Sequence, residues 1–351
     1  MSDKKIKVAV IYNEAHPELY KIPESKEKVG EFTQYFEIEN LTPMEEYEYI
    51  AKSLKKVGFQ AYALNIKDDL LTLVDHIKYK KPDVIFNFVE IFKERERLEM
   101  NIVGVYELMG VPYTGAPALC LANCQNKVLA KRLLKANGIK TPDFTYFYTE
   151  AKSYKHNLTF PLIVKPSFQD ASVGIENESI VHNQKELNER VNYVLKHFNP
   201  PVLVEEFIDG RELNVAVVGD KKLKVLPISE IDFKRMPDHL HNIVSYQAKW
   251  DPYHEAYHKT IPICPAKLPK KVEEKAKDIA LKAFRVMECR DYARVDMRLA
   301  KNKELYVLEV NPNPDLTEGA GFMRSAEHEG MSYAKALKKI AMLAYERGKK
   351  K

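Results

Sequence analysis

The chain has 351 residues, of which 45% are hydrophobic and 30% charged, a composition typical of a globular protein with two or three domains. Its formal net charge of +5 comes from scattered lysines and not from a basic block with interleaved aromatic residues, which argues against a nucleic-acid partner. No run approaches the length of a membrane span, and the polar first residues lack the apolar segment of a signal peptide. We therefore expect a cytoplasmic protein with no membrane partner.

The cysteines are Cys120, Cys124, Cys264 and Cys289, and no two of them form a Cys-x-x-Cys pair. This pattern is typical of reduced, buried thiols in a cytosolic protein. Cys120 and Cys124 lie one helical turn apart, but no His or further Cys stands close to them in the sequence. The sequence therefore argues against a metal site at these two thiols.

The first third of the chain alternates between strand and helix patterns. Thr42-Pro43-Met44-Glu45 opens a helix with a capping box and with proline at the first helical position. The expected elements are a strand at 7–12, a helix from 42 to about 58, a strand at 59–64, a helix at 70–79, a strand at 83–89 and a helix ending near 108–110. This order predicts an open parallel sheet with right-handed crossovers. Residues 14–41 fit the pattern poorly and predict a long loop or a lid.

The remainder begins with two helices between about 116 and 138 and then becomes richer in strands. We expect strands at 161–165, 202–206, 213–218 and 223–229, and helices at 184–198, 270–287 and 333–346. Residues 239–258 are polar and aromatic with little periodicity, which predicts a mobile lid. The fold class is therefore expected to be α/β, with α+β character in the C-terminal part.

The most informative stretch of the sequence is a predicted hairpin near the C-terminus. Its strands contain Arg294-Val295-Asp296 and Glu309-Val310-Asn311, and the polar residues 301–303 form the turn. Side chains two positions apart share one face of a strand, so one face carries two carboxylates, an amide oxygen and a guanidinium. Hard oxygen ligands suit Mg²⁺, and the arginine can stabilise developing negative charge. The alternative is a solvated hairpin, but Glu309 and Asn311 interrupt an apolar run, where unpaired polar groups are costly.

Two lysines are candidates for binding phosphate. Lys165 ends an apolar strand just before a small, polar loop that runs to Gly174. A lysine there can reach phosphate as a point charge, and the N–H groups of the loop can cover phosphate oxygens. A strand end with a snorkelling lysine explains this segment about equally well. Lys127, at a helix start, is a weaker candidate when considered alone.

A second apolar strand ends in Glu205-Glu206, followed by Phe207-Ile208. The carboxylates can accept from an adenine amino group or from ribose hydroxyls, and the main chain at 207–208 can pair with the adenine edge. Alone this signal is weak, because glutamates at a strand end usually lie on the surface.

In this order, these segments make the chain resemble the ATP-grasp superfamily and, within it, the D-alanine–D-alanine ligase group. The resemblance runs from about residue 107 to 333. It includes Glu-Leu-Met-Gly-Val-Pro-Tyr-Thr-Gly at 107–115, Ser-Val-Gly at 172–174, Cys-Pro-Ala at 264–266 and Gly-Met-Ser-Tyr at 330–333. It implies a three-domain architecture: an N-terminal domain at 1–115, a central subdomain at 116–205, and a C-terminal subdomain at 206–351 with the metal site and the lid.

The resemblance also implies roles for particular residues. The ATP phosphates would contact Lys127 and Lys165. The adenosine pocket would be lined by Glu205, Glu206, Phe207, Ile208 and Glu212. Two Mg²⁺ ions, or Mn²⁺, would be held by Asp296, Glu309 and Asn311. The candidate catalytic residues are Arg294, which would face the tetrahedral intermediate, Lys249 in the lid, and Ser172.

Several positions depart from the family's pattern, mainly where the amino-acid substrates bind. Tyr-Asn-Glu-Ala at 12–15 replaces a glycine-rich turn, and residues 90–100 replace a segment with His-Gly and Gly-Glu-Asp-Gly. Ala171 falls where the family has a serine for the first D-alanine, and Lys249-Trp250 stands for Lys-Tyr. Pro314-Asp315 and the Ala-Gly at 320–321 replace the residues that hold the second D-alanine.

These departures leave the function open between alternatives. The leading hypothesis is an ATP-dependent carboxylate–amine ligase that acts through an acylphosphate on unidentified small molecules. A genuine D-alanine–D-alanine ligase is the second hypothesis, and a nucleotide-binding protein without ligase activity is the third. Asp315 and Glu318 favour an acceptor with an extra amino group, or one without a free acid, although Asp315 is also a residue that commonly caps a turn. The family resemblance implies a possible homodimer through the first domain.

Overall fold

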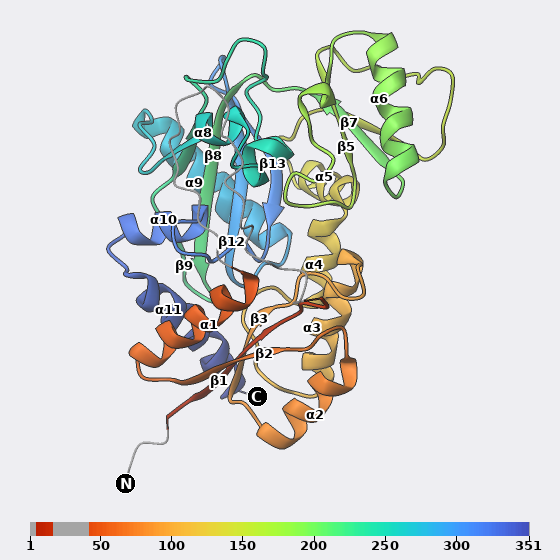
Figure 1. The fold of residues 1–351 in the computed structure, drawn as a ribbon. Helices are drawn as coiled ribbons and strands as arrows, with labels where there is room; N and C mark the ends of the chain where they lie inside the picture. The colour runs from red at the N-terminus through yellow and green to blue at the C-terminus, as the bar shows by residue number, and fades with distance from the viewer. Residues whose placement is uncertain (1–4, 17–41, 351) are drawn as a thin grey trace.

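The N-terminal strands form a parallel sheet, as the sequence predicts. The computed structural model describes residues 5–16 and 42–350, and within these ranges the strand order of this sheet is β2-β1-β3. Figure 1 shows it at the end of the molecule that carries both chain termini. Its elements are β1 (Lys7–Tyr12), α1 (Pro43–Lys56), β2 (Gln60–Asn65), α2 (Leu70–Lys80), β3 (Val84–Phe88) and α3 (Glu99–Leu108). Most of the predicted loop at 14–41 lies outside the described residues.

Helix α1 begins at the predicted capping box. The Thr42 side chain accepts a hydrogen bond from the Glu45 N–H, and the Glu45 carboxylate accepts one from the Thr42 N–H at 2.9 Å. Ile50 and Leu54 lie on the same face of the helix and are buried. They pack with the sheet, so local capping and the apolar face determine the same helix.

The central part contains an antiparallel sheet with the order β4-β7-β5-β6. Leu162, Val164, Leu187 and Val191 share one core, which packs α6 against this sheet. The elements are α4 (Ala118–Gln125), α5 (Lys127–Ala136), β4 (Phe144–Phe147), β5 (Leu162–Pro166), β6 (Ile180–Val181), α6 (Gln184–His197) and β7 (Val202–Glu206).

A larger antiparallel sheet forms the C-terminal part. Its order is β11-β10-β8-β12-β13, with β9 paired to β8. The strands are β8 (Gly210–Gly219), β9 (Leu223–Val225), β10 (Ser229–Asp232), β11 (Ile261–Ile263), β12 (Asp291–Ala300) and β13 (Leu305–Asn311). The helices are α7 (Tyr246–Trp250), α8 (Glu255–Lys259), α9 (Lys270–Val286), α10 (Gly321–His328) and α11 (Tyr333–Gly348).

Two cores cover opposite faces of the large sheet. Ala280 and Phe284 of α9 pack with Val215 and Val295 on one face. On the other face, α10 and α11 share a core with the N-terminal sheet, in which Leu337 packs with residues such as Val8. Helix α11 contacts β3 of the N-terminal sheet and β8 and β12 of the large sheet, and Figure 1 shows it beside α1. This arrangement confirms the mixed α/β fold class, while the boundaries at 115 and 205 stay a prediction.

The structure differs from the sequence-based prediction at several places. The predicted strand at 223–229 is divided into β9 and β10, and the interruption contains Pro227, which has no N–H for a sheet hydrogen bond. Strands β4 and β11 and helix α10 were not predicted, because each is short. Cys289 lies beside Cys120 and Cys124, which corrects the expectation that no further cysteine is near them.

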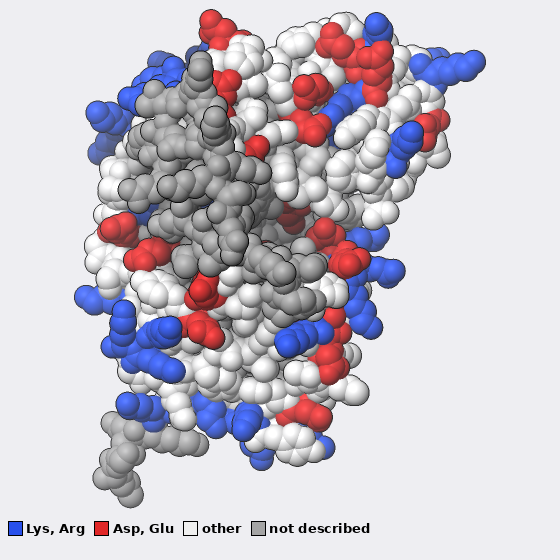
Figure 2. Space-filling view, in the orientation of Figure 1, with Lys and Arg blue, Asp and Glu red and all other residues white. Residues whose placement is uncertain are grey.

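Among the described residues, no helix is both long enough and apolar enough to span a membrane. On the face shown in Figure 2, acidic and basic side chains are interspersed over the surface.

A buried ion pair joins three distant segments. The Asp291 carboxylate at the start of β12 is fully buried and accepts two hydrogen bonds from Arg347 of α11, at 2.5 and 3.0 Å. It also accepts one from the Gly115 N–H at 3.0 Å. Asp291 has φ 64°, in the left-handed region that Asp tolerates better than most residues. This contact holds the C-terminal helix against the start of the strand that carries Arg294 and Asp296.

We expect Arg347→Ala to lower the free energy of unfolding by about 3 kcal/mol, because it leaves a buried carboxylate without its cation. The measurement is chemical denaturation of the full chain. In the Asp291→Asn background, Arg347→Ala should cost clearly less, since no charge is stranded. Equal losses in the two backgrounds would show that the ion pair is not the cause.

Candidate active site

The β12–β13 hairpin presents the predicted polar residues next to one another. Asp296 pairs with Glu309, and Arg294 pairs with Asn311, in the antiparallel register of the two strands. A bulge or irregularity follows Asp296, so the register shifts only beyond the polar pairs. The structure thus brings together all four residues that the sequence placed on one face.

Asp296 is held by three hydrogen bonds. Arg294 donates to both of its carboxylate oxygens, from Nε to Oδ1 at 2.7 Å and from Nη2 to Oδ2 at 2.7 Å. Asn214 of β8 donates from Nδ2 to Oδ1 at 2.8 Å. Burial lowers the pKa of Arg294, but Asp296 outweighs this effect and the pKa is raised. Sequence reasoning missed Asn214, although an amide within the apolar run at 213–218 was a signal.

Glu309 lies at a deep but open position. Its side chain is 40% exposed, yet burial still raises its pKa, as expected for a group inside a cleft. The positive charges of Lys127, Lys165 and Arg294 outweigh burial and lower the pKa of Glu309 to about 2. The nearest of these groups is Lys127, whose Nζ lies 3.6 Å from Oε2. Glu309 is therefore an ionised carboxylate surrounded by cations.

Lys127 connects the β12–β13 hairpin to the loop that follows Lys165. Its Nζ lies 2.7 Å from Asp170 Oδ1 in that loop, and its N–H donates to the Ser167 carbonyl at 3.1 Å. Asn126 caps α5 by accepting from the Leu129 N–H at 3.1 Å, which fixes the first residue of the helix. Burial lowers the pKa of Lys127, but the negative charges of Asp170 and Glu309 raise it by a larger amount. The pKa therefore lies above its ordinary value, and the side chain stays charged.

Glu205 lies buried between two lysines. Lys131 Nζ is 2.5 Å from Oε2, and Lys165 pairs with Oε1. Burial raises the pKa of Glu205, but the lysines outweigh it and the pKa is lowered. Burial lowers the pKa of Lys131 to about 8. Sequence reasoning missed Lys131, although it lies four residues after Lys127 and so on the same face of α5.

The predicted adenosine residues lie along the end of β7 and the start of β8. Glu206 alternates with Glu205 on the strand, and its carboxylate accepts from the Thr159 N–H at 2.9 Å. The Phe207 N–H donates to the Pro161 carbonyl at 2.9 Å. That N–H is therefore used within the fold, and pairing of the main chain at 207–208 with adenine stays a prediction.

Glu212 and Ile208 also lie where β7 ends and β8 begins. Glu212 on β8 pairs with Arg298, whose Nη2 lies 2.8 Å from Oε2. Burial raises the pKa of Glu212. Ile208 is half-buried in the turn that connects β7 with β8. Their role toward adenosine stays a prediction.

The predicted lid at 239–258 contacts the loop that follows Lys165. The Ser172 hydroxyl donates to the Val244 carbonyl, and Trp250 Nε1 donates to the Ala171 carbonyl, both at 2.8 Å. Ser172 thus contacts the main chain of the lid. Burial and Arg294 lower the pKa of Lys249, and Glu309 is among the groups that raise it, so Lys249 lies within electrostatic range of the hairpin.

Acidic groups lie on the other side of Lys249. Glu90 is exposed by its accessible surface. The desolvation by surrounding protein atoms and the charge of Asp315 nevertheless raise its pKa to about 7, although Lys249 acts to lower it. Asp315 caps its own turn, because Oδ1 accepts from the Thr317 N–H at 2.8 Å and from its hydroxyl at 2.6 Å. Asp315 therefore caps its turn, which was the alternative that the sequence left open. Its negative charge also acts on Glu90 and Lys249. The Glu318 carboxylate accepts from the Tyr49 hydroxyl at 2.8 Å.

Asp296, Glu309 and Asn311 fit a hard divalent cation by the chemistry of their donors. They offer carboxylate and amide oxygens on adjacent strands, and such ligands suit Mg²⁺. Because Arg294 and Asn214 occupy the Asp296 carboxylate, a cation at Asp296 would have to replace at least one of these hydrogen bonds.

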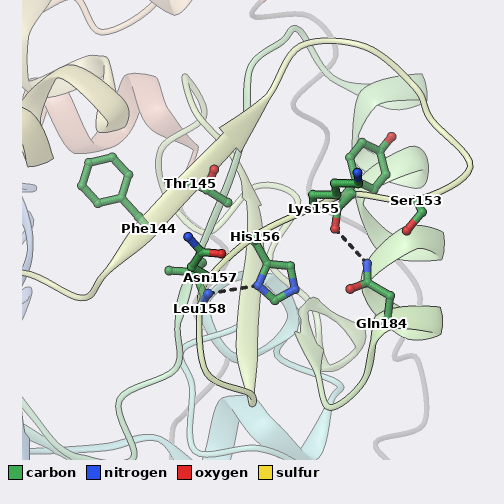
Figure 3. A pocket seen from close by; sticks show the side chains of 9 residues that line it. Phe144, Thr145, Ser153, Lys155, His156, Asn157, Leu158 and Gln184 are labelled. Atoms are coloured by element: carbon green, nitrogen blue, oxygen red, sulfur yellow. Dashed lines mark hydrogen bonds between the residues drawn. The ribbon is translucent and has the colours of Figure 1, made fainter.

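A pocket of about 780 Å³ lies apart from these residues. Phe144, Thr145, His156 and Gln184 are among the residues that line it, beside α6 on the small sheet (Figure 3). None of the predicted site residues lines this pocket, so its size is no argument for the position of the chemistry.

Solved structures share the fold of this chain over nearly its whole length. Two crystal structures described as D-alanine–D-alanine ligase from Bacillus anthracis, one of them complexed with ATP, each match 98% of this chain and 99% of their own. The TM-scores are 0.71 and 0.72, at 22% and 23% sequence identity. Together with the family match below, this fold assigns the chain to the ATP-grasp enzymes that are ATP-dependent carbon–nitrogen ligases.

The family described as D-ala D-ala ligase C-terminus matches residues 133–342. A D-alanine–D-alanine ligase of Desulforudis audaxviator is 32% identical over 70% of this chain and 77% of its own. One of Carboxydothermus hydrogenoformans is 29% identical over 85% and 91%, and the uncharacterized protein y4sG of Sinorhizobium fredii is 30% identical over 85% and 87%. The chain belongs to the D-alanine–D-alanine ligase family.

We expect Lys165→Ala to weaken ATP binding roughly tenfold or more, because a hydrogen bond to a charged group contributes about 1.5–3 kcal/mol. Lys165→Arg should not restore the affinity, since a planar fork does not replace a compact ammonium. Calorimetry with ATP and Mg²⁺ measures this. Lys135→Ala, which removes an exposed lysine from α5, is the control. Unchanged affinity in Lys165→Ala would make Lys165 a structural residue only.

Glu309→Gln should reduce substrate-dependent phosphate release by at least about a hundredfold, because it removes a charged ligand and disturbs the balance of cations around it. Glu304→Gln, on the turn before β13, should keep its activity. Near-normal rates in Glu309→Gln at ordinary Mg²⁺ concentrations would exclude Glu309 from the metal site. Circular dichroism checks that both variants are folded.

Proposed function

We propose that this protein joins a carboxylate to an amine at the expense of ATP, through an acylphosphate. A carboxylate oxygen would attack the γ-phosphorus and ADP would leave. The amine nitrogen would then attack the acyl carbon, and phosphate would leave with the bonding electrons. The observation that carries this proposal is the set of cations around one ionised carboxylate, which lowers the pKa of Glu309 to about 2. Such a cluster suits a polyanion that gains charge during transfer.

The residues divide into tasks under this proposal. Lys127 and Lys165 would bind ATP phosphates, and Asp296, Glu309 and Asn311 would hold Mg²⁺ or Mn²⁺, with two ions expected. The cation would neutralise charge on the transferring phosphoryl group. Arg294 would stabilise the oxyanion of the tetrahedral intermediate. Glu205 would orient Lys165 and so act as a positioning residue, which its ion pair with Lys165 supports.

The lid would exclude water from the acylphosphate. Its contacts with Ala171 and Ser172 support this role, because they bring Lys249 over the same cleft as Arg294. Exclusion of water matters because an acylphosphate hydrolyses readily. Opening of residues 239–258 would then admit substrates and release products.

The acidic side of the cleft favours an acceptor that carries an additional positive charge, or one that lacks a free acid. Glu90 and Asp315 lie where they interact with Lys249, and a second carboxylate from a substrate would be repelled there. Glu318 is less suited to this task than the sequence suggested, because it pairs with Tyr49.

A genuine D-alanine–D-alanine ligase is the second candidate, and the names of the relatives favour it. The absence of ligase activity is disfavoured by the same family match. A homodimer through residues 1–115 is a further expectation from the family.

The decisive experiment is a panel screen for phosphate release with ATP, Mg²⁺ and paired amino acids and amines. We expect release to depend on both a carboxylate and an amine, with D-alanine pairs among the poor substrates. Glu309→Gln serves as the blank for contaminating activity. Rates with D-alanine that match the best pair would establish the second candidate, and ATP hydrolysis indifferent to every pair would contradict ligation.

A pH dependence tests the acidic acceptor site. Because the pKa of Glu90 is raised to about 7, its carboxylate is neutral below this pH and charged above it. The KM for a cationic acceptor should therefore fall as the pH rises through about 7. Glu90→Gln should remove this change, and the ratio of KM between variant and wild type at each pH cancels the titration of the amine itself. A constant ratio from pH 6 to pH 8 would exclude Glu90 from acceptor binding.

A further inference from the structure

Three of the four cysteines lie close together, beside the start of β12. Cys120 and Cys124 lie on α4, and Cys289 lies in the turn between α9 and β12. The Sγ atoms of Cys120 and Cys124 are 4.0 Å apart, and those of Cys120 and Cys289 are 3.6 Å apart. All three sulfurs lie within 4.8 Å of one another. Cys120 and Cys124 are buried, whereas Cys289 is half-buried.

This spacing is close to that of thiolates around a metal ion. A Zn–S bond of about 2.3 Å in tetrahedral geometry separates two sulfurs by about 3.8 Å. The two shortest separations in the cluster lie on either side of this value. A disulfide would require two sulfurs to approach to about 2.05 Å and would leave the third sulfur without a partner.

Arg290 supplies a compensating charge. Its Nε donates to the Gly115 carbonyl at 2.9 Å, and its guanidinium lies 4.4 Å from the centre of the Tyr113 ring. Its Nη2 is buried and has no hydrogen-bond partner within the described ranges. Three thiolates and a divalent cation carry a net charge of −1, which an adjacent guanidinium offsets.

We propose that Cys120, Cys124 and Cys289 bind a thiophilic closed-shell cation, Zn²⁺ or Cu⁺, as three thiolate ligands. Soft thiolates select these ions over Mg²⁺, so Mg²⁺ at the proposed ATP site would not compete for the cysteines. Binding as thiolates releases the thiol protons to solvent, and no atom changes its oxidation state. The ion ties α4, which leads directly to Lys127, to the start of β12, which carries Arg294. Its role is therefore structural.

The test is a titration of the reduced, metal-free full chain with Cd²⁺ as the probe. We expect one Cd²⁺ per chain, with the ultraviolet charge-transfer absorption of cadmium thiolates and a release of protons. Cys289→Ser should lose this absorption. Cys264→Ser should keep it, because Cys264 lies outside the cluster and its Sγ is 3.8 Å from the Pro227 carbonyl. Competition with Zn²⁺ and with Cu⁺ then identifies the preferred ion, and excess Mg²⁺ should not compete.

A second measurement uses the native wild-type chain and needs no variant. Alkylation read by mass spectrometry should show that Cd²⁺ protects the half-buried Cys289 but leaves the rate at Cys264 unchanged. Absence of the absorption, equal protection of Cys289 and Cys264, or displacement of Cd²⁺ by Mg²⁺ would each overturn the proposal. Formation of a Cys120–Cys289 disulfide in place of metal binding would overturn it as well.

Discussion

Repulsion among positive charges is the constraint on which this cleft depends. Lys127, Lys165, Arg294 and Lys249 face a shared space, where like charges would repel strongly without partners. Each carboxylate in the cleft therefore has a part in keeping the cations in place. Asp170 holds Lys127, and Asp296 holds Arg294 in two parallel hydrogen bonds. Under the proposed function, these carboxylates would hold the cations in place for the phosphates of a polyanion.

The fold positions these groups by drawing on elements that are far apart in the chain. The central β4-β7-β5-β6 sheet contributes Lys165 and Glu205, and α5 contributes Lys127 and Lys131. The large C-terminal sheet contributes the β12–β13 hairpin. Glu205 is the clearest link between them, since it lies on the small sheet and pairs with a lysine from α5. Moving one sheet relative to the other would separate these charges, so the cation cluster and the packing of the sheets depend on each other.

Local patterns in the sequence predicted the parts of the site that lie on regular elements. The alternation in Arg294-Val295-Asp296 and in Glu309-Val310-Asn311 predicted both strands and the face that their polar side chains share. Contacts between distant segments were beyond such reasoning. Asn214 meets Asp296 only because β8 pairs with β12, and Cys289 meets Cys120 only because the turn after α9 packs beside α4. The ion pair between Lys131 and Glu205 likewise joins α5 to β7, and no local pattern in the sequence predicts it.

The bidentate pair between Arg294 and Asp296 has a consequence for the order of events in the cleft. The pair occupies two of the five N–H donors of the guanidinium, so a full turn of Arg294 toward a substrate would require it to release Asp296. An exchange of this kind couples two equilibria: a cation that takes over Asp296 lowers the cost of freeing Arg294, and a bound anion that attracts Arg294 makes Asp296 more available. Cation and anion would each raise the affinity for the other by the same factor, without any movement of the backbone. A latch made from one side chain would thus give this cleft positive linkage between its ligands.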